Sequence, residues 1–170
     1  MLVLDEMGAN VGRAPTHARA PRNEPAYAQA PANHGANHTT LAVLTPAGLV
    51  AAMTVRGAAD ALTVAAFLRT LVVPLLRPGQ ILVLDNVATH KGAGVRRLVE
   101  AAGCQLRFLP AYSPDLSPIE EAFAKLKALL RRAKARTAAA LDAALGSALD
   151  AITPHDARHY FAHCGYGTAT

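Results

Sequence analysis

The chain has 170 residues, 52% of them hydrophobic and 17% charged, and its formal net charge is +5. Such a chain is long enough to bury a core without disulfides, and its composition excludes a disordered protein. Its two cysteines, Cys104 and Cys164, make no disulfide framework and indicate a reducing, intracellular setting.

The first half of the chain contains three expected strands and one long irregular segment. Residues 1–6, MLVLDE, are an apolar run that ends in two acids, which is typical of a strand and lacks the basic start of a signal peptide. Residues 8–37 are rich in Ala, Pro, Asn, Gly and Arg with little periodicity, so they predict a long excursion of a kind that is usually functional or mobile. Residues 38–45 and 49–57, joined by Pro-Ala-Gly, predict a hairpin of two strands.

The second half of the chain alternates between expected helices and strands. Residues 61–76 have a helical pattern that ends near Pro74, and Arg69 breaks the same apolar run, which argues against a membrane span. Residues 81–86, ILVLDN, are the kind of near-continuous apolar run that is buried on both faces of a sheet. The remaining expected elements are a helix at 92–103 closed by Gly103, a strand at 104–110, and helices at 119–135, about 138–151 and 154–163.

This order of elements predicts one α/β domain over residues 1–170. Its sheet would be mixed, with an antiparallel hairpin first and helical crossovers after it. In such sheets, sites form beyond the carboxyl ends of neighbouring parallel strands. Asp5 and Asp85 both follow apolar runs, so we expect the two carboxylates to meet at one edge of the sheet.

Basic residues are concentrated in one third of the chain. Residues 91–136 contain 10 Lys and Arg against 4 Asp and Glu, whereas residues 1–90 contain 6 against 5 and residues 137–170 contain 1 against 3. A concentrated basic surplus is typical of a surface that binds a polyanion such as nucleic acid. A solvated helix face explains the charge alone equally well.

Residues 117–121, SPIEE, offer a third acid at the start of the long expected helix. Mg²⁺ prefers oxygen ligands, so Asp5, Asp85 and one glutamate would supply a ligand set, and two such ions about 4 Å apart can assist in-line phosphoryl transfer. Adjacent helix positions point about 100° apart, so Glu120 and Glu121 cannot both face one site. The sequence SPIE also fits a capping box, in which the Glu120 side chain would serve the start of the helix.

Longer motifs accompany these acids. Asp85 and Glu120 are separated by 34 residues, and this part of the chain includes DNxxxHK at 85–91 and RFLPAYSPDLSPIEEAF at 107–123. These motifs resemble the second half of the DDE catalytic domain of mariner-superfamily transposases, particularly their bacterial insertion-sequence branch, in which a second Asp and a third acid recur at this spacing. LDE at 4–6 is similar to the segment that carries the family's first Asp. Three further segments are similar to that branch: GRAP at 12–15, NHGANHTTLAVLTPAGL at 33–49 and HYFAHCGYG at 159–167.

The resemblance implies an RNase H-like fold, a mixed β-sheet flanked by helices, which agrees with the order of elements. It implies that Asp5, Asp85 and Glu120 are the catalytic residues and the metal ligands, with Mg²⁺ as the cofactor, Mn²⁺ as its substitute and two ions in the site. The implied reaction is cleavage of double-stranded DNA at transposon ends, followed by attack of the freed 3′-hydroxyl on target DNA. The resemblance also implies a homo-oligomer on DNA and a bacterial cytoplasmic protein that is associated with the nucleoid when bound to DNA.

Other residues near the acids have candidate roles in binding DNA. Asn86 and His90 either contact the scissile phosphate or are simply a turn former and a surface histidine. Tyr112, in the loop before the acid-bearing helix, either stacks on a base or packs against the protein. Candidate phosphate contacts, each of them equally well a plain surface residue, are Lys91, Arg96, Arg97, Lys125, Lys127, Arg131 and Arg132.

Three histidines recur every four residues on the last expected helix, at His155, His159 and His163. They share one helix face and in that sense suit a transition metal. No acid or thiol is obviously arranged with them, so a solvated or partly packed face is the favoured interpretation.

The family's transposases carry an N-terminal helix-turn-helix region that reads the transposon ends, and no segment of this chain has that paired-helix pattern. We therefore expect a catalytic domain without this region, which is one half of a split or frameshifted element, a remnant of a transposase, or a module that works with a separate helix-turn-helix partner. The alternatives to an active transposase are a catalytically inactive or partner-dependent nucleic-acid-binding remnant and a host nuclease of RNase H-like fold.

Overall fold

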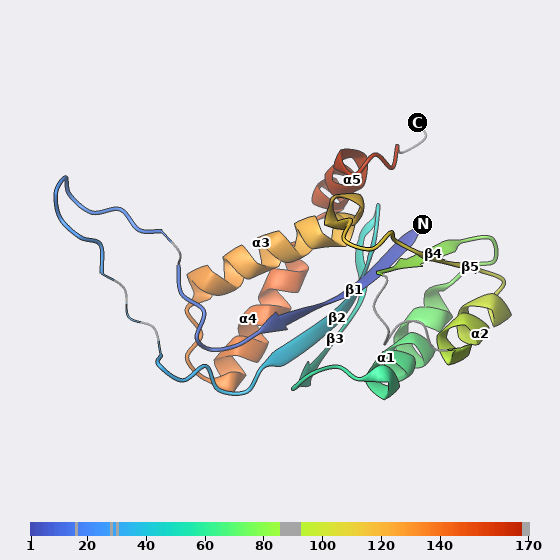
Figure 1. Ribbon diagram of the computed structural model, residues 1–170, viewed down its shortest axis with the longest axis horizontal. Coiled ribbons are helices and arrows are strands. Elements are labelled where there is room, and N and C mark those ends of the chain that lie inside the picture. The colour runs from blue at the N-terminus through green and yellow to red at the C-terminus, as the bar shows by residue number, and fades with distance from the viewer. Residues whose placement is uncertain (16, 28, 30, 86–92, 168–170) are drawn as a thin grey trace.

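Five strands form one mixed sheet in the computed structural model, which describes residues 1–15, 17–27, 29, 31–85 and 93–167. The strands are β1 (Leu2–Ala9), β2 (His38–Thr45), β3 (Gly48–Arg56), β4 (Ile81–Leu84) and β5 (Gln105–Phe108). Their order across the sheet is β3-β2-β1-β4-β5 (Figure 1). β1–β2 and β2–β3 are antiparallel, whereas β1–β4 and β4–β5 are parallel. The α/β class and the mixed sheet with its hairpin first are thus confirmed.

Helices cover both faces of the sheet. They are α1 (Ala61–Phe67), α2 (Ala93–Ala101), α3 (Pro118–Ala133), α4 (Ala138–Asp150) and α5 (Pro154–His163). α1 and α2 lie on one side of the sheet, and α3, α4 and α5 lie on the other (Figure 1). Each lies within two residues of the helix expected from the sequence, except that the expected 61–76 helix continues from α1 through further helical turns.

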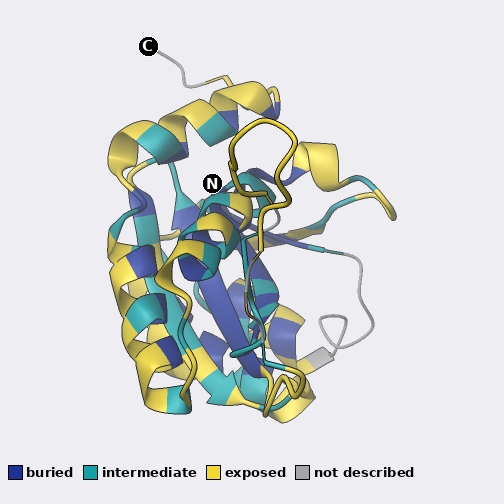
Figure 2. Cartoon of the chain, turned by 90° about the vertical axis from the view of Figure 1, so that its left-hand side faces the viewer, coloured by how far each residue is buried: buried dark blue, intermediate teal, exposed yellow. Residues whose placement is uncertain are grey.

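The alternation of side chains along β1 explains the two layers. Leu2 and Leu4 point to the face covered by α1 and α2, whereas Val3 and Met7 point to the face covered by α3, α4 and α5. All four side chains are buried. Figure 2 shows these buried strands between helices whose outer surfaces are exposed. A strand of this pattern needs cover on both faces, and the chain supplies a helical layer for each.

β1 is longer than the apolar run that predicted it. Met7 and Ala9 are buried like Val3, so the alternation continues beyond the acids to Ala9. β1 pairs with β2 along this whole length, from Val3 with Leu44 to Ala9 with His38. The expected end of the strand at residue 6 is therefore wrong, because antiparallel pairing with β2 continues where the apolar run stops.

The helical segment after Asp60 changes width along its length. The Asp60 side chain accepts a hydrogen bond from the backbone N–H of Thr63 at 2.8 Å and so caps α1. α1 then continues as a π-helical turn at Leu68–Val72 and a tight 3₁₀ turn at Val73–Leu75. The segment ends at Leu75, one residue beyond Pro74, which has no backbone N–H to donate to the carbonyl of the preceding turn.

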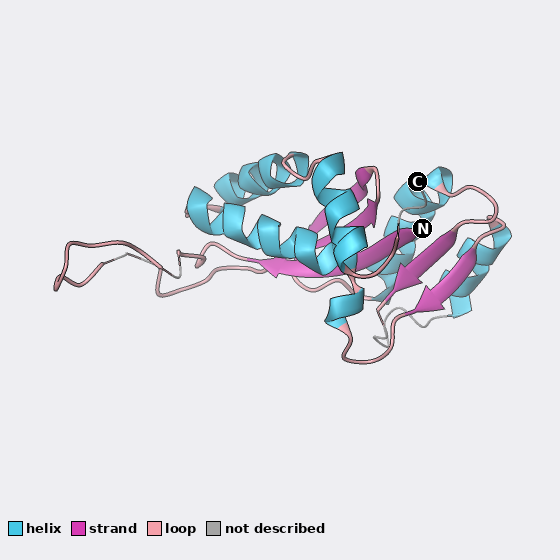
Figure 3. Cartoon of the chain, turned by 90° about the horizontal axis from the view of Figure 1, so that it is seen from above, coloured by secondary structure: helices cyan, strands magenta, loops and turns pink. Residues whose placement is uncertain are grey.

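Residues 10–37 form the expected excursion between β1 and β2. The described part of this segment contains no helix or strand and extends away from the sheet (Figure 1, Figure 3). Arg136, just after α3, holds its base, because the guanidinium donates to the carbonyls of Val11 at 3.0 Å, Arg13 at 3.0 Å and Gln29 at 3.1 Å.

No helix among the described residues is both long enough and apolar enough to cross a membrane.

Candidate active site

The register of β1 and β4 brings two acids together. Their parallel pairing runs from Leu2 with Leu82 to Leu4 with Leu84, so Asp5 and Asp85 directly follow the last pair. Both alternate onto the face of Val3 and Val83, the face that α3 covers. The sequence predicted that Asp5 lies at the carboxyl end of its strand, but β1 continues beyond it to Ala9. Asp5 lies where β4 stops pairing while β1 continues with β2.

Asp5 is held in place by its own backbone neighbour. Asp5 is 8% exposed, and its Oδ1 accepts a hydrogen bond from the backbone N–H of Glu6 at 2.7 Å. Asp85 is half-buried at the end of β4. The sheet therefore presents one buried and one more accessible carboxylate side by side.

Glu120 approaches from the first turn of α3. Ser117 occupies the N-cap position and Pro118 the first helical position, as expected, but the Ser117 side chain makes no capping hydrogen bond. The expected capping box is therefore not formed. The half-buried Glu120 side chain makes no hydrogen bond or ion pair in the described part of the chain, so it is not committed to the helix start.

The neighbouring Glu121 points elsewhere. Its Oε1 lies 3.0 Å from Nδ1 of His163 on α5. The step of about 100° between adjacent helix positions turns Glu120 and Glu121 to different surroundings, as expected.

Asp5, Asp85 and Glu120 line one cavity of about 520 Å³. Its other lining residues are Glu6, Ser117 and the loop Leu109–Pro114. The SPDLSP loop thus has two effects, since it closes one side of the cavity and leads into the helix that carries Glu120. The cavity brings together the three acids proposed as a set from the sequence, although a shared cavity does not by itself make them ligands.

The donor set fits a hard divalent cation by its chemistry, since all three side chains offer carboxylate oxygens. Across the described residues, however, no group of three His, Cys, Asp or Glu side chains stands close enough to hold an ion. The acids therefore share a cavity without forming a ready-made ion cage. The same finding covers the histidine face of α5, where His163 is paired with Glu121.

Tyr112 lies in the loop at the edge of the cavity. Its side chain is fully exposed, and its backbone φ is +58°, in the left-handed region that residues other than glycine seldom adopt. The interpretation that Tyr112 packs against the protein is therefore wrong.

The other candidate DNA contacts are divided between two faces. Arg96 and Arg97 are exposed on α2, across the sheet from the cavity, and Arg96 pairs with Glu100 at 3.3 Å. Lys127 and Arg131 are half-buried on α3, and Arg132 is exposed there. Asn86, His90 and Lys91 lie outside the described residues.

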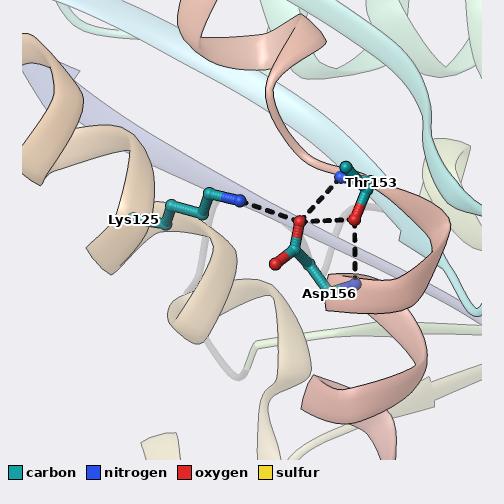
Figure 4. A network of polar contacts seen from close by, with 3 residues as sticks. All are labelled: Lys125, Thr153 and Asp156. Carbon is teal, nitrogen blue, oxygen red and sulfur yellow. Dashed lines mark hydrogen bonds and ion pairs between the residues drawn. The ribbon is translucent and has the colours of Figure 1, made fainter.

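Lys125 is engaged inside the molecule. Its Nζ lies 2.8 Å from Oδ2 of Asp156 on α5 (Figure 4). Asp156 and Thr153 form a capping box, in which each side chain accepts from the backbone N–H of the other, at 2.9 and 3.1 Å. The hydrogen bonds from Lys125 and Thr153 hold the pKa of the Asp156 carboxyl far below its usual range. Lys125 is thus a weaker candidate for phosphate contact than its neighbours.

A second contact fixes the loop before α3. The Tyr166 hydroxyl donates to the carbonyl of Leu116 at 2.8 Å, at the end of the 3₁₀ turn Pro114–Leu116. The Tyr166 ring packs edge-on against Phe161 of α5, with centroids 6.1 Å apart. The positioning roles of Tyr166 and Arg136 are not predictable from the sequence, because both depend on long-range contacts and not on local spacing.

The sequence matches the family described as "DDE superfamily endonuclease" over residues 1–142. No curated protein matches the chain. Among solved structures, the chain is similar to that described as "Crystal structure of the Mos1 Strand Transfer Complex", with a TM-score of 0.77 and 18% identity over 96% of this chain and 50% of that one. It is also similar to the Mos1 mariner paired end complex with Mn, with a TM-score of 0.76 and 19% identity over 96% of this chain and 52% of that one.

The Mos1 transposase catalytic domain with Raltegravir and Mg gives a TM-score of 0.70 and 18% identity over 96% of this chain and 77% of that one. At these identities the likeness establishes the fold, and it confirms the expected RNase H-like sheet flanked by helices. The chain spans about half the length of the Mos1 chains in the two larger complexes.

Proposed function

Since this chain belongs to the DDE superfamily endonucleases, we propose that it is a transposase catalytic domain that cleaves DNA at transposon ends and joins the freed 3′ end to target DNA. The observation that carries this proposal is the meeting of Asp5, Asp85 and Glu120 around one cavity, from two strands and a helix. The motifs quoted above support its assignment to the insertion-sequence branch.

Asp5, Asp85 and Glu120 would hold Mg²⁺ or Mn²⁺, as two ions. The Mos1 structures described with Mn and with Mg support this choice of ions. When bound, such ions activate the attacking oxygen and stabilise the leaving oxygen of a phosphoryl transfer. Asp5 would be the buried ligand of the set, and the half-buried Asp85 and Glu120 would be its more accessible ligands.

The protein's own groups position the DNA. The Glu6 N–H fixes the orientation of the Asp5 carboxylate, and α3 gives Glu120 a rigid support whose first turn is packed at Pro118 and Ile119. The exposed Tyr112 ring would stack on a base at the edge of the cavity. Together these contacts would hold a phosphodiester between the sheet and α3.

The partners of the proposed enzyme are double-stranded transposon ends and target DNA. The Mos1 structures include a strand transfer complex and paired-end complexes, which supports DNA as the partner and a homo-oligomer assembled on it.

A plasmid-nicking assay with two neighbouring glutamates as a matched pair tests the proposed chemistry. Glu120→Gln should lower metal-dependent nicking by more than about 100-fold, beyond the 10–100-fold that outer-shell partners of metal ligands cost. Asp85→Asn should behave alike, because both substitutions remove a ligand charge. Glu121→Gln should stay within about threefold of the wild type, since Glu121 pairs with His163 away from the cavity.

Equal nicking by wild type and Glu120→Gln would contradict the proposal, as would equal losses for Glu120→Gln and Glu121→Gln. An inactive nucleic-acid-binding module is the second candidate function, and the basic surplus of residues 91–136 is equally consistent with it. DNA binding by a wild type that nicks no better than Asp85→Asn would support that candidate.

A further inference from the structure

A line of residues on α3 leads away from the carboxylate cavity. Lys127 and Arg131 follow Glu120 by 7 and 11 positions, so both point within about 20° of its direction around the helix. At a rise of about 1.5 Å per residue, they lie about 10 and 16 Å further along the axis. Glu120, Lys127 and Arg131 therefore share one face of α3, with the acid at one end and two cations after it.

The neighbouring face of the same helix is already occupied. Glu121 pairs with His163, and Lys125 pairs with Asp156, both toward α5. In contrast, neither Lys127 nor Arg131 has an ion pair or hydrogen bond in the part of the chain that the structure describes. Both residues are half-buried, so part of each side chain lies against the protein, while no acid among the described residues forms an ion pair with its charged group.

A third cation joins this face from another element. Arg13 follows β1 and lies near enough to Arg131 that burial, and then the charge of Arg131, lower the pKa of the Arg13 guanidinium. The Arg13 side chain donates to the carbonyl of Gly8 through Nη2, while its buried Nε has no hydrogen-bond partner among the described residues. Arg136 also holds this segment through the carbonyl of Arg13. The contact from Arg136 therefore places the segment that carries Arg13 beside the end of α3, the end that carries Arg131.

An anion that binds between neighbouring cations lowers their mutual repulsion, and guanidinium groups suit phosphate oxygens. We propose that Lys127, Arg131 and Arg13 form a phosphate track, which guides the backbone of one DNA strand from the carboxylate cavity along α3 to the base of residues 10–37. This inference rests on the proposed function, because it takes the polyanion to be DNA. A track of about 16 Å corresponds to about five nucleotides at 3.4 Å of rise each.

The phosphate track also separates the candidate contacts into two groups. Arg96 and Arg97 lie on α2, on the opposite face of the sheet, so they do not contact the DNA strand that follows α3. Arg132 is adjacent to Arg131 but points about 100° away, which makes it a control of the same residue type, helix and net charge.

Binding of a fluorescent 30-base-pair duplex without metal, over a series of salt concentrations, tests the phosphate track. Arg131→Gln and Lys127→Gln should each weaken binding by about 3–10-fold, because each removes a phosphate contact. Each should also reduce the magnitude of the negative slope of log K, the association constant, against log salt concentration by about 1. Arg132→Gln should change binding by less than about twofold. Arg131→Lys should restore most of the lost affinity, because the charge is kept.

Arg13 requires a stability control because its side chain also holds the carbonyl of Gly8. Arg13→Lys and Arg13→Gln should therefore be compared by thermal unfolding as well as by binding, and the track predicts that only Arg13→Gln lowers the salt slope. Equal effects of Arg131→Gln and Arg132→Gln would overturn the track, and so would a wild type that does not bind the duplex.

The binding assay contains no metal and reads no cleavage, so it is independent of the nicking assay. If the track variants bind as predicted but Asp85→Asn nicks like the wild type, the phosphate track is supported and the proposed metal-dependent cleavage is contradicted. The reverse result, metal-dependent nicking with no preference between Arg131 and Arg132, would remove the track alone.

Discussion

Tyr112 combines a fully exposed ring with a backbone at φ +58°. A residue other than glycine in this region carries strain of about 1–3 kcal/mol, and the exposed ring buries no apolar area that would offset it. Stacking on a nucleotide base would bury the ring and offset that cost. Because the exposed Tyr112 ring lines the carboxylate cavity, its role in DNA binding can be measured separately from its contribution to folding.

Tyr112→Ala should weaken DNA binding by about 5–150-fold, the equivalent of the 1–3 kcal/mol that a base–aromatic stack contributes, while Tyr112→Phe should bind like the wild type. Both variants should unfold within about 0.5 kcal/mol of the wild type, because the ring contacts little of the protein. Duplex binding and thermal unfolding measure the two effects. Tyr27→Ala, which removes another exposed ring on the excursion, is the control, and unchanged binding by Tyr112→Ala would remove the stacking role.

At the scale of elements, the position of Glu120 depends on α5. At the start of α5, Asp156 joins the two helices, because it caps α5 together with Thr153 and pairs with Lys125 of α3 (Figure 4). At the other end of α5, Tyr166 holds the turn that precedes Glu120. Thus α5 contacts the acid-bearing helix from both of its ends, and its loss would loosen one wall of the cavity.

Asp156→Ala should destabilise the protein by about 1–2 kcal/mol at pH 7, since it removes a helix cap and an ion pair together. In a chain of this size, this corresponds to a fall in the melting temperature of about 2–8 °C. Asp150→Ala, at an exposed acid of α4, should shift it by less than about 0.5 kcal/mol and is the control.

The same contacts set a pH dependence. The folded-state pKa of Asp156 is lowered from its ordinary value of 3.8, so its contribution is fully present above that value. This contribution is lost as the pH falls from there toward the folded-state pKa. The difference in melting temperature between wild type and Asp156→Ala should therefore shrink below about pH 4. A difference that stays constant down to pH 2.5 would contradict this origin.

At the scale of the whole molecule, the sequence was sufficient for what depends on local pattern. Short or near-continuous apolar runs predicted the strands β1 and β4, and an acid after each run was enough to place Asp5 and Asp85 at one edge. The sequence also predicted a capping hydrogen bond from Ser117, which is not formed. Whether an N-cap side chain reaches the helix N–H groups depends on the conformation of the preceding loop, which the local sequence does not determine. The end of β1 was missed for a similar reason, since pairing with β2 is a long-range contact.

The distribution of charge needed the fold. Lys125 and Lys127 are equivalent in sequence, yet one pairs with Asp156, 31 residues away, and the other has no such partner among the described residues. The basic surplus of residues 91–136 likewise divides between α2 and α3, on opposite faces of the sheet. Composition predicts a surface that binds a polyanion, but only the topology shows which of the cations lie on the same face of the sheet.

The most direct test of the central claim, that three carboxylates around one cavity hold the metal, is thermal unfolding with added Mn²⁺. At ten times the dissociation constant, a bound ion adds about 1.4 kcal/mol, or about 3–6 °C for a chain of this size. Wild type and Glu121→Gln should both show this rise, and Glu120→Gln should not, although its stability without metal should be similar. An equal rise in Glu120→Gln, or no rise in the wild type, would contradict the account.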